Sequence, residues 1–281
     1  MGQSSAQSIS PSEAAVEPIV RLVNLRRVFG RSRVLKGVNI DFPRGRTTVV
    51  LGPSGCGKSV MLKHLIGLLR PTSGQVWFNQ TRVDSLSEMK LGPIRRQFGF
   101  LFQNSALFDS LPVGDNVAFP LTEHTSLSRE ERRERVNTVL SMVGLADTVA
   151  KMPGDLSGGQ RKRVALARAI VLKPKVILYD EPTTGLDPIR ADVINELVLK
   201  LKRELNATSI VVTHDLTSAF KIADEMVMLH DGRVILRGLP EEFRSSDVPL
   251  VRRFLQGEAT PEELVGIRSQ VVAETTPAHG G

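Results

Sequence analysis

The sequence predicts an α/β fold in which helices wrap a mainly parallel sheet. Short apolar runs typical of buried strands alternate with helical patterns along most of the 281 residues. The clearest unit is the apolar run 47–51, which stops at the glycine-rich stretch 52–59 and continues into a helical pattern over 59–69. Residues 113–173 interrupt the alternation with several helical patterns in succession. We therefore expect a sheet-based core with an inserted helical subdomain.

The other elements are expected on the same grounds. The dipeptide Asp231-Gly232 separates two apolar runs and is typical of a two-residue hairpin turn. In chain order, we expect strands over 19–24 and 38–42, helices over 129–143 and 159–172, a strand over 176–179, a helix over 189–205, a strand over 209–213, a helix over 216–222, strands over 227–230 and 233–236, and helices over 240–244, 249–255 and 261–270.

The chain divides into a main domain and two extensions. Residues 1–17 are rich in Ser, Ala and Gln and lack apolar periodicity, which predicts a disordered lead-in. The main domain is expected over 18–240, with the helical insertion at about 105–173. Residues 241–281 are expected to form a helical extension with a flexible end.

Composition argues against several classes of protein. No stretch reaches the roughly 18 apolar residues that a membrane-spanning helix requires. The N-terminus lacks the basic patch and apolar core of a signal peptide, and Ala6 stands where a myristoylation pattern needs Ser or Thr. Cys56 is the only cysteine, so an internal disulfide is impossible. We expect a soluble protein that stays in the cytosol.

The formal charge of +7 does not by itself indicate a nucleic-acid partner. Most basic residues are mixed with acidic ones, as in 129–135, which is typical of a solvated helix face. We interpret the one compact basic run as surface charge or as charge near a nucleotide; it consists of Arg26, Arg27, Arg31, Arg33 and Lys36.

The glycine-rich stretch has the pattern G-x-x-x-x-G-K-[ST] between a strand and a helix, which predicts a phosphate-binding loop. Glycines allow a tight turn whose N–H groups point at the phosphates, and the helix N-terminus adds a positive field. Lys58 would reach the β- and γ-phosphates, and the Ser59 hydroxyl would bind Mg²⁺. The residues expected to hold ATP here are Gly52, Pro53, Ser54, Gly55, Cys56, Gly57, Lys58, Ser59 and Val60.

Polar side chains follow two further strands. Asp180 and Glu181 end the run 176–179, where Asp180 could bind the metal and Glu181 could polarise an attacking water. The alternative is that these carboxylates only terminate the strand. His214 ends the run 209–213 and could donate to a γ-phosphate oxygen, although a lone histidine at a strand end is more often structural.

The sequence L-S-G-G-Q at 156–160 opens a helix whose first turn offers unpaired N–H groups. It forms a second candidate anion site without a lysine of its own. One fold rarely needs two such sites for one ATP, so we expect this one to serve the nucleotide held by another copy. A simple N-cap by Ser157 is the alternative.

These motifs resemble the ATPase subunits of ABC transporters from about residue 19 to 238. The resemblance implies a P-loop NTPase (ABC ATPase) fold with a RecA-like core, an antiparallel β subdomain and the inserted helical subdomain. It also implies that Gln103 contacts Mg²⁺ and senses a membrane partner, and that Asp187, in Gly185-Leu186-Asp187, communicates across a dimer. Phe29 stands where the family has an aromatic residue that stacks on adenine.

The expected site residues can be grouped by role. The catalytic set is Lys58, Gln103, Glu181 and His214; the metal set is Ser59, Gln103 and Asp180; and the ATP contacts outside the loop are Phe29, Ser157, Gly158, Gly159, Gln160 and Asp187.

Two segments resemble the ATPases of Mla/Mce phospholipid systems in particular: F-Q-x-x-A-L-F-x-x-L at 102–111 and V-x-x-N-V-x-x-P-L at 113–121. The segments D-E-P-T-T-G-L-D-P at 180–188 and V-R-R-F-L-Q-G at 251–257 fit that group too. The resemblance implies an ATPase that moves phospholipid between membranes. Import of a small polar solute, such as an amino acid, a metal chelate or a sulfonate, is the alternative.

The resemblance also implies partners and a location. We expect a homodimer of ATPase subunits on integral membrane permease subunits, bound peripherally to the cytoplasmic face of the inner membrane. An Mce-type lipid-binding protein and a small regulatory subunit are further candidate partners. A nucleic-acid or translation ATPase is disfavoured, because no long coiled coil separates 52–59 from 176–181 and no second ATPase half is present.

Overall fold

The structure is a computed structural model that describes residues 17–259. Apart from Glu17, the predicted lead-in lies outside the described residues, and so does the helix expected over 261–270. Among the described residues, no helix combines the length and the apolarity needed to cross a membrane.

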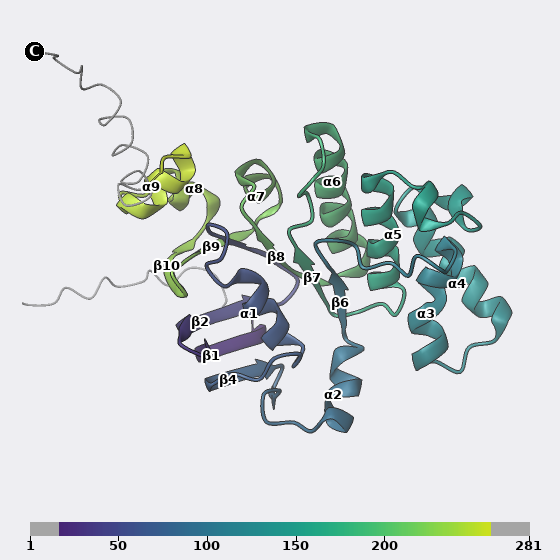
Figure 1. Ribbon diagram of the computed structural model, residues 1–281, viewed down its shortest axis with the longest axis horizontal. Helices are drawn as coiled ribbons and strands as arrows, with labels where there is room; N and C mark the ends of the chain where they lie inside the picture. The colour runs from purple at the N-terminus through teal and green to yellow at the C-terminus, as the bar shows by residue number, and fades with distance from the viewer. Residues whose placement is uncertain (1–16, 260–281) are drawn as a thin grey trace, which may run out of the picture.

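Two sheets form the frame of the molecule (Figure 1). In the larger sheet every neighbouring pair of strands is parallel except β10 with β9, which form the hairpin expected around Asp231-Gly232. Its six strands lie in the spatial order β10 (Arg233–Gly238), β9 (Glu225–His230), β3 (Thr47–Leu51), β8 (Thr208–Thr213), β7 (Val176–Asp180) and β6 (Phe98–Leu101).

The smaller sheet is antiparallel. Its first two strands are longer than the runs expected over 19–24 and 38–42, because their polar ends continue the ladder into a tight turn. Its four strands lie in the order β2 (Ser32–Pro43), β1 (Pro18–Phe29), β4 (Ser73–Phe78) and β5 (Thr81–Arg82).

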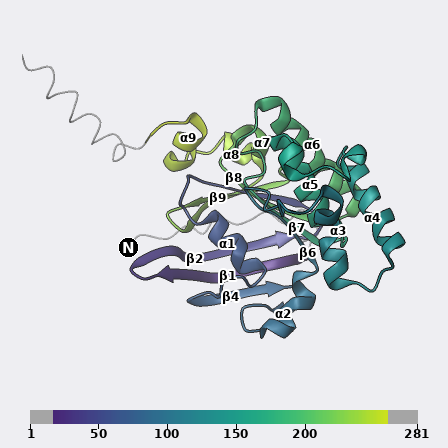
Figure 2. The ribbon, with the colours of Figure 1, turned by 45° about the vertical axis from the view of Figure 1, so that its right-hand side comes forward.

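One hydrophobic core lies on each face of the larger sheet. Helix α1 (Lys58–Leu65) lies between the two sheets, as Figures 1 and 2 show, and buries Met61 and Leu62 in the first core. In β3, Val50 points into this core while its neighbours Val49 and Leu51 point into the other. Helix α1 ends earlier than the expected 59–69, because Gly67 takes a positive φ of 66° just beyond it.

Helices cover the second face. Helices α6 (Pro188–Leu205) and α7 (Leu216–Ile222) lie over the sheet, and α5 (Gly158–Ile170) packs against β6 (Figure 1). Helices α3 (Val113–His124) and α4 (Arg129–Met142) pack on α5 and on each other. Helix α5 therefore joins the helical region 113–170 to the edge of the sheet.

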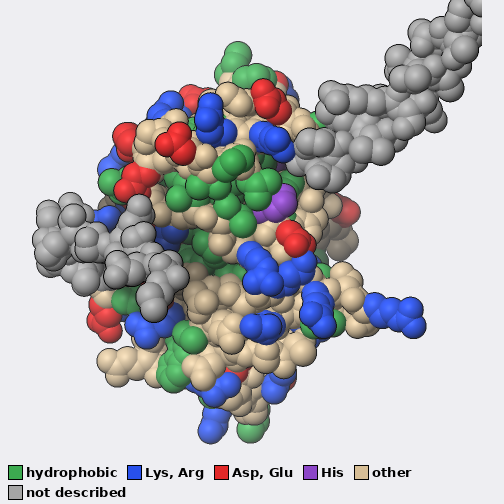
Figure 3. All heavy atoms as spheres, turned by 90° about the vertical axis from the view of Figure 1, so that its left-hand side faces the viewer, with side chains coloured by type: hydrophobic (Ala, Val, Ile, Leu, Met, Phe, Trp, Pro, Cys, Tyr) green, Lys and Arg blue, Asp and Glu red, His purple; other side chains and the backbone are tan. Residues whose placement is uncertain are grey.

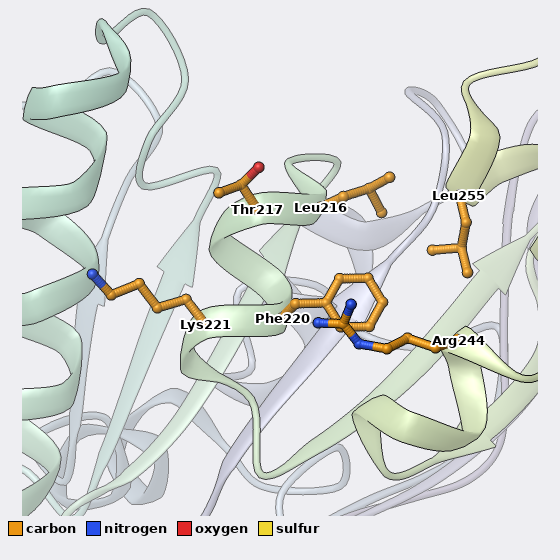
Figure 4. Close-up of a pocket in the computed structure, with 6 residues that line it drawn as sticks. All are labelled: Leu216, Thr217, Phe220, Lys221, Arg244 and Leu255. Carbon is orange, nitrogen blue, oxygen red and sulfur yellow. The ribbon is translucent and has the colours of Figure 1, made fainter.

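The C-terminal helices α8 (Pro240–Arg244) and α9 (Pro249–Gln256) pack on their own chain through the buried residues Phe243 and Val251. Between these helices and α7 lies a hollow (Figure 4). In it the Arg244 guanidinium lies 4.2 Å from the centre of the Phe220 ring. Leu255 approaches the hollow from α9.

Lys and Arg side chains gather around a depression on the face that forms the left-hand side of Figure 1 (Figure 3). The compact basic run lies on the hairpin of β1 and β2, where Arg26, Arg31 and Arg33 are exposed. Within this run, the Lys36 ammonium is paired with Asp231 of the β9–β10 turn at 2.5 Å.

Candidate functional site

The glycine-rich loop joins β3 to α1 and depends on glycine at two places. Gly52 has a φ of 154°, and a Cβ added there would lie 2.0 Å from the Leu229 carbonyl oxygen. Gly57 caps α1 with a φ of 106°, and its Cβ would lie 2.8 Å from a Leu35 methyl group. The loop therefore closes tightly only with these glycines, and it turns the N-terminus of α1 toward a cavity.

Lys58 supplies a buried positive charge at this cavity. Its side chain is only 6% exposed, and its ammonium donates to the carbonyl oxygens of Gly52 at 2.7 Å and Pro53 at 3.1 Å. The same nitrogen lies 3.5 Å from Oε1 of Glu181. An anionic group entering the cavity would find an ammonium that the loop already holds in place.

Ser59 and Asp180 bring two hard oxygen atoms together. The Ser59 hydroxyl donates to Oδ1 of Asp180 at 2.7 Å. Burial raises the pKa of the Asp180 carboxyl, although the hydrogen bond from Ser59 acts in the opposite direction. A hydroxyl and a buried carboxylate fit a divalent cation such as Mg²⁺, which would also offset the unfavourable burial of the negative charge. Gln103 lines the adjoining cavity and could add an amide oxygen.

Glu181 has an unusual backbone and a crowded carboxylate. Its φ is 50°, a left-handed conformation that costs a non-glycine residue free energy. Its Oε2 lies 2.9 Å from Nδ1 of His214 and accepts at 3.3 Å from the hydroxyls of Thr184 and Thr213. The carboxylate is thus held at the cavity wall between His214 and Lys58.

The cavity itself has a volume of about 430 Å³, within the usual range for small-molecule sites. Phe29 is 41% exposed, and the Arg27 guanidinium lies 4.3 Å from the centre of its ring. One face of that ring is therefore covered by a cation. The cavity is lined by Phe29, Val34, Ser54, Gly55, Gly57, Lys58, Ser59, Val60, Gln103, Glu181 and His214.

Other expected residues support the loop without lining the cavity. The loop also contains Gly52, Pro53 and Cys56, which do not line the cavity. The Cys56 side chain is buried close to Gly52. Burial raises the pKa of the Cys56 thiol, which therefore stays protonated and fills space.

The L-S-G-G-Q segment does not line this cavity either. Ser157 caps α5, because its hydroxyl accepts from the Gln160 N–H at 3.3 Å while Gln160 accepts from the Ser157 N–H at 2.9 Å. A Cβ added to Gly158 would lie 3.8 Å from Leu186, so this helix start lies beside the start of α6, which Asp187 caps. The two caps adjoin each other, and the first turn of α5 does not line the cavity of its own chain.

Sequence reasoning missed two residues of the site. Val34 lines the cavity, and the Lys162 ammonium donates to the backbone carbonyl oxygen of Glu181 at 3.2 Å. Lys162 lies in the charged run Arg161–Lys162–Arg163, and such a run is typical of an exposed helix face. The available signal was its spacing of three residues from Gly159 and four from Leu166, both of which are buried.

The chain is similar to known proteins along most of its length. A protein-family model described as ABC transporter matches residues 35–184. The "Probable ribonucleotide transport ATP-binding protein mkl" of Mycobacterium leprae is 44% identical over 238 residues, which cover 85% of this chain and 69% of that protein. The "Intermembrane phospholipid transport system ATP-binding protein MlaF" of Haemophilus influenzae is 41% identical over 241 residues, covering 86% of this chain and 91% of that protein.

A solved structure is similar along most of its length. It is the dimeric post-hydrolysis state of the ATP-binding cassette MJ0796 bound to ADP and Pi, with a TM-score of 0.73 and 36% identity. The match covers 79% of this chain and 98% of the cassette.

Proposed function

Because this chain belongs to the ABC transporter family and is one of its ATP-hydrolysing subunits, we propose that it energises the movement of phospholipid between membranes. The observation that carries the ATPase part is the convergence of the glycine-rich loop, Glu181 and His214 on one cavity. Support for the lipid part comes from the likeness to the H. influenzae protein, whose name states intermembrane phospholipid transport.

ATP would bind with its phosphates over the loop and its adenine on Phe29. The Lys58 ammonium and the first turn of α1 would contact the β- and γ-phosphates. The adenine would stack on the ring face of Phe29 opposite Arg27.

Ser59, Asp180 and Gln103 would hold Mg²⁺. The closeness of the Ser59 and Asp180 oxygens supports this assignment, because both are hard oxygen ligands of the kind that Mg²⁺ prefers. When bound, the ion neutralises phosphate charge in the transition state.

Glu181 would act as the general base that takes a proton from the attacking water. Its Oε2 atom already has acceptor contacts with His214 and two threonines, while its Oε1 atom lies 3.5 Å from the Lys58 ammonium. A γ-phosphate would draw Lys58 away from this oxygen and leave it for water. His214 would hold the carboxylate and donate to the phosphate.

A second copy of the chain would complete each site. The first turn of α5 is capped by Ser157, does not line the cavity of its own chain, and lies beside the Asp187 cap of α6. In a head-to-tail dimer, Ser157, Gly158, Gly159 and Gln160 would bind the γ-phosphate held by the opposite chain. The dimeric solved cassette is consistent with such an assembly.

An aromatic groove of about 600 Å³ would bind the permease. Its lining includes Phe102 and Ala106 on either side of Gln103 in the chain, and the rings of Phe108 and Phe119 meet in it at 4.9 Å between centroids, both about 40% exposed. Exposed aromatic rings in a groove are typical of a protein-binding site. Docking there would place the permease next to a metal-binding glutamine and keep the protein on the cytoplasmic face of the membrane.

Transport of a small polar solute is the second candidate. It is supported by the likeness to the M. leprae protein, whose name states ribonucleotide transport. The ATP site would be the same in either case, so only the permease and its cargo separate the two functions.

Co-purification tests the proposal. The tagged full-length chain is recovered from native membranes in mild detergent, and bound proteins and lipids are read by mass spectrometry. We expect a permease, an Mce-type lipid-binding protein, enriched phospholipid and, as a further candidate, a small regulatory subunit. Phe108→Asp should lose the permease, whereas Leu68→Asp, at a residue 50% exposed outside the groove, should keep it.

Two outcomes would change the account. A permease with a soluble solute-binding protein and no lipid would favour solute import. Nucleic acid or ribosomes without a permease would contradict the transporter function.

A further inference from the structure

Lys162 is a buried cation that the roles assigned above leave unused. It lies in the second turn of α5, and only 5% of it is exposed. Burying an ammonium costs free energy unless polar groups surround it. Its nitrogen donates at 3.2 Å to two backbone carbonyl oxygens, those of Gln103 and Glu181.

The two carbonyls belong to the two loops that carry reacting groups. Gln103 follows β6 and Glu181 follows β7, and these strands are parallel neighbours in the sheet. Both loops are also conformationally costly, because Glu181, Ser105 and Ala106 have positive φ values of 50°, 63° and 49°. The Glu181 N–H still donates to the Val212 carbonyl of β8 at 2.9 Å, but among the described residues it is the Lys162 ammonium that ties the Glu181 turn to the Gln103 turn.

The same helix reaches the first loop a second time. The Arg168 guanidinium donates to the Ser105 carbonyl at 2.8 Å. Helix α5 thus begins with the L-S-G-G-Q turn and then holds the backbones of Gln103, Ser105 and Glu181.

We propose that Lys162 is a positioning residue, which transmits the position of α5 to the backbones of Glu181 and Gln103. The inference rests on the proposed roles of Glu181 and of α5 in the dimer. When the first turn of α5 engages the opposite chain's nucleotide, Lys162 sets Glu181 and Gln103 of its own chain in their working positions. Burial lowers the pKa of Lys162, while the nearby carboxylates of Glu181 and Asp180 favour its charged form.

The alternative is that Lys162 only stabilises the fold by satisfying two buried carbonyls. The two readings differ in what its loss does. Misplacing a base by about 1 Å can cost about 100-fold in rate without changing how tightly the nucleotide binds. Loss of a merely structural contact lowers the melting temperature and leaves kcat of the folded protein unchanged.

The test compares Lys162→Met, Lys162→Gln and Lys162→Arg in the full-length protein with Arg163→Met. Arg163 is a matched control, because it donates from the same helix to the carbonyls of Val143 and Gly144, away from the cavity. For each variant kcat, KM for ATP, the equilibrium binding of ATP and the melting temperature are measured.

We expect Lys162→Met to lower kcat by about 10- to 100-fold with KM and ATP binding within about twofold of the unchanged protein. Lys162→Arg should recover most of kcat, because it restores a cationic donor. Arg163→Met should keep kcat. If Lys162→Met does not fold, Lys162→Gln carries the same test, since its amide keeps a donor without the charge.

Two results would overturn the proposal. The first is an unchanged kcat in Lys162→Met. The second is a loss of kcat in Arg163→Met that parallels its loss of melting temperature. Glu181→Gln, measured alongside, separates this failure from that of the proposed mechanism. If Glu181→Gln abolishes turnover while Lys162→Met does not, only the inference about Lys162 fails.

Discussion

Nδ1 of His214 lies 2.9 Å from Oε2 of Glu181, at the adjoining ends of β8 and β7. The contact orients a carboxylate whose backbone already has an uncommon positive φ. It leaves Oε1 of Glu181 directed toward Lys58, where the γ-phosphate would lie. The pair is therefore arranged so that phosphate binding can free one carboxylate oxygen for water.

Glu181→Gln should keep ATP binding and lower turnover by about 10²- to 10⁴-fold, because an amide cannot accept the proton from water. His214→Ala should lower turnover less, since Thr184 and Thr213 still contact the carboxylate. Steady-state hydrolysis and equilibrium ATP binding measure both effects. The control is Glu134→Gln on the exposed face of α4. Normal turnover in Glu181→Gln would remove this residue from its proposed role.

Phe29→Ala should weaken ATP binding by about 10-fold, equivalent to about 1.4 kcal/mol, because stacking on the adenine is lost. Phe29→Tyr should bind normally, since it keeps the ring. Titration with a fluorescent adenine nucleotide and with free triphosphate separates the base from the phosphates. A loss shared equally by both ligands would argue against stacking, and Met89→Ala at an exposed position should change neither.

Asp180→Asn should stabilise the nucleotide-free protein at neutral pH. The folded-state pKa of Asp180 is raised by burial, so the folded protein favours the neutral carboxyl and loses stability as pH rises through that pKa. We expect a gain of about 1 kcal/mol, which is about 2–4 °C in Tm for a chain of this size. The gain should vanish well below the ordinary aspartate pKa of 3.8, where the carboxyl is protonated in both states.

The same variant should lose the extra thermal stability that Mg²⁺ adds in the presence of ATP, because a metal ligand is gone. Thermal unfolding at pH 3 and pH 7.5, with and without Mg-ATP, measures both effects. Asp109→Asn, at an exposed position, should show neither. A lower Tm for Asp180→Asn at pH 7.5 without nucleotide would contradict the account.

Much of the fold could be predicted from the sequence. The α/β class and the ABC ATPase architecture are confirmed by the likeness to the solved cassette. Strand β3 and helix α7 begin and end as expected, because apolar runs and cap residues mark both. Strand β6 has only four residues, and α2 (Glu88–Arg95) contains Gly92 and Pro93, so neither carries a recognisable pattern.

The residues of the candidate site could also be predicted only in part from the sequence. The loop residues and the carboxylates at strand ends could be named from the sequence because their spacing is local. Val34 and Lys162 belong to no motif and reach the site from other parts of the chain. The spacing of Lys162 from buried Gly159 and Leu166 indicates burial but not which groups it contacts. Lysine side chains are seldom fully buried, so the residue type alone predicts an exposed position for Lys162. In the structure its side chain is buried.

In the proposed mechanism two copies of the chain form each working site. ATP hydrolysis per subunit is therefore measured over a range of protein concentrations, with the oligomeric state recorded in parallel. The account predicts that hydrolysis per subunit falls on dilution as the dimer dissociates, because Ser157 of the opposite chain is lost from each site. A rate per subunit that stays constant down to fully monomeric samples would contradict it.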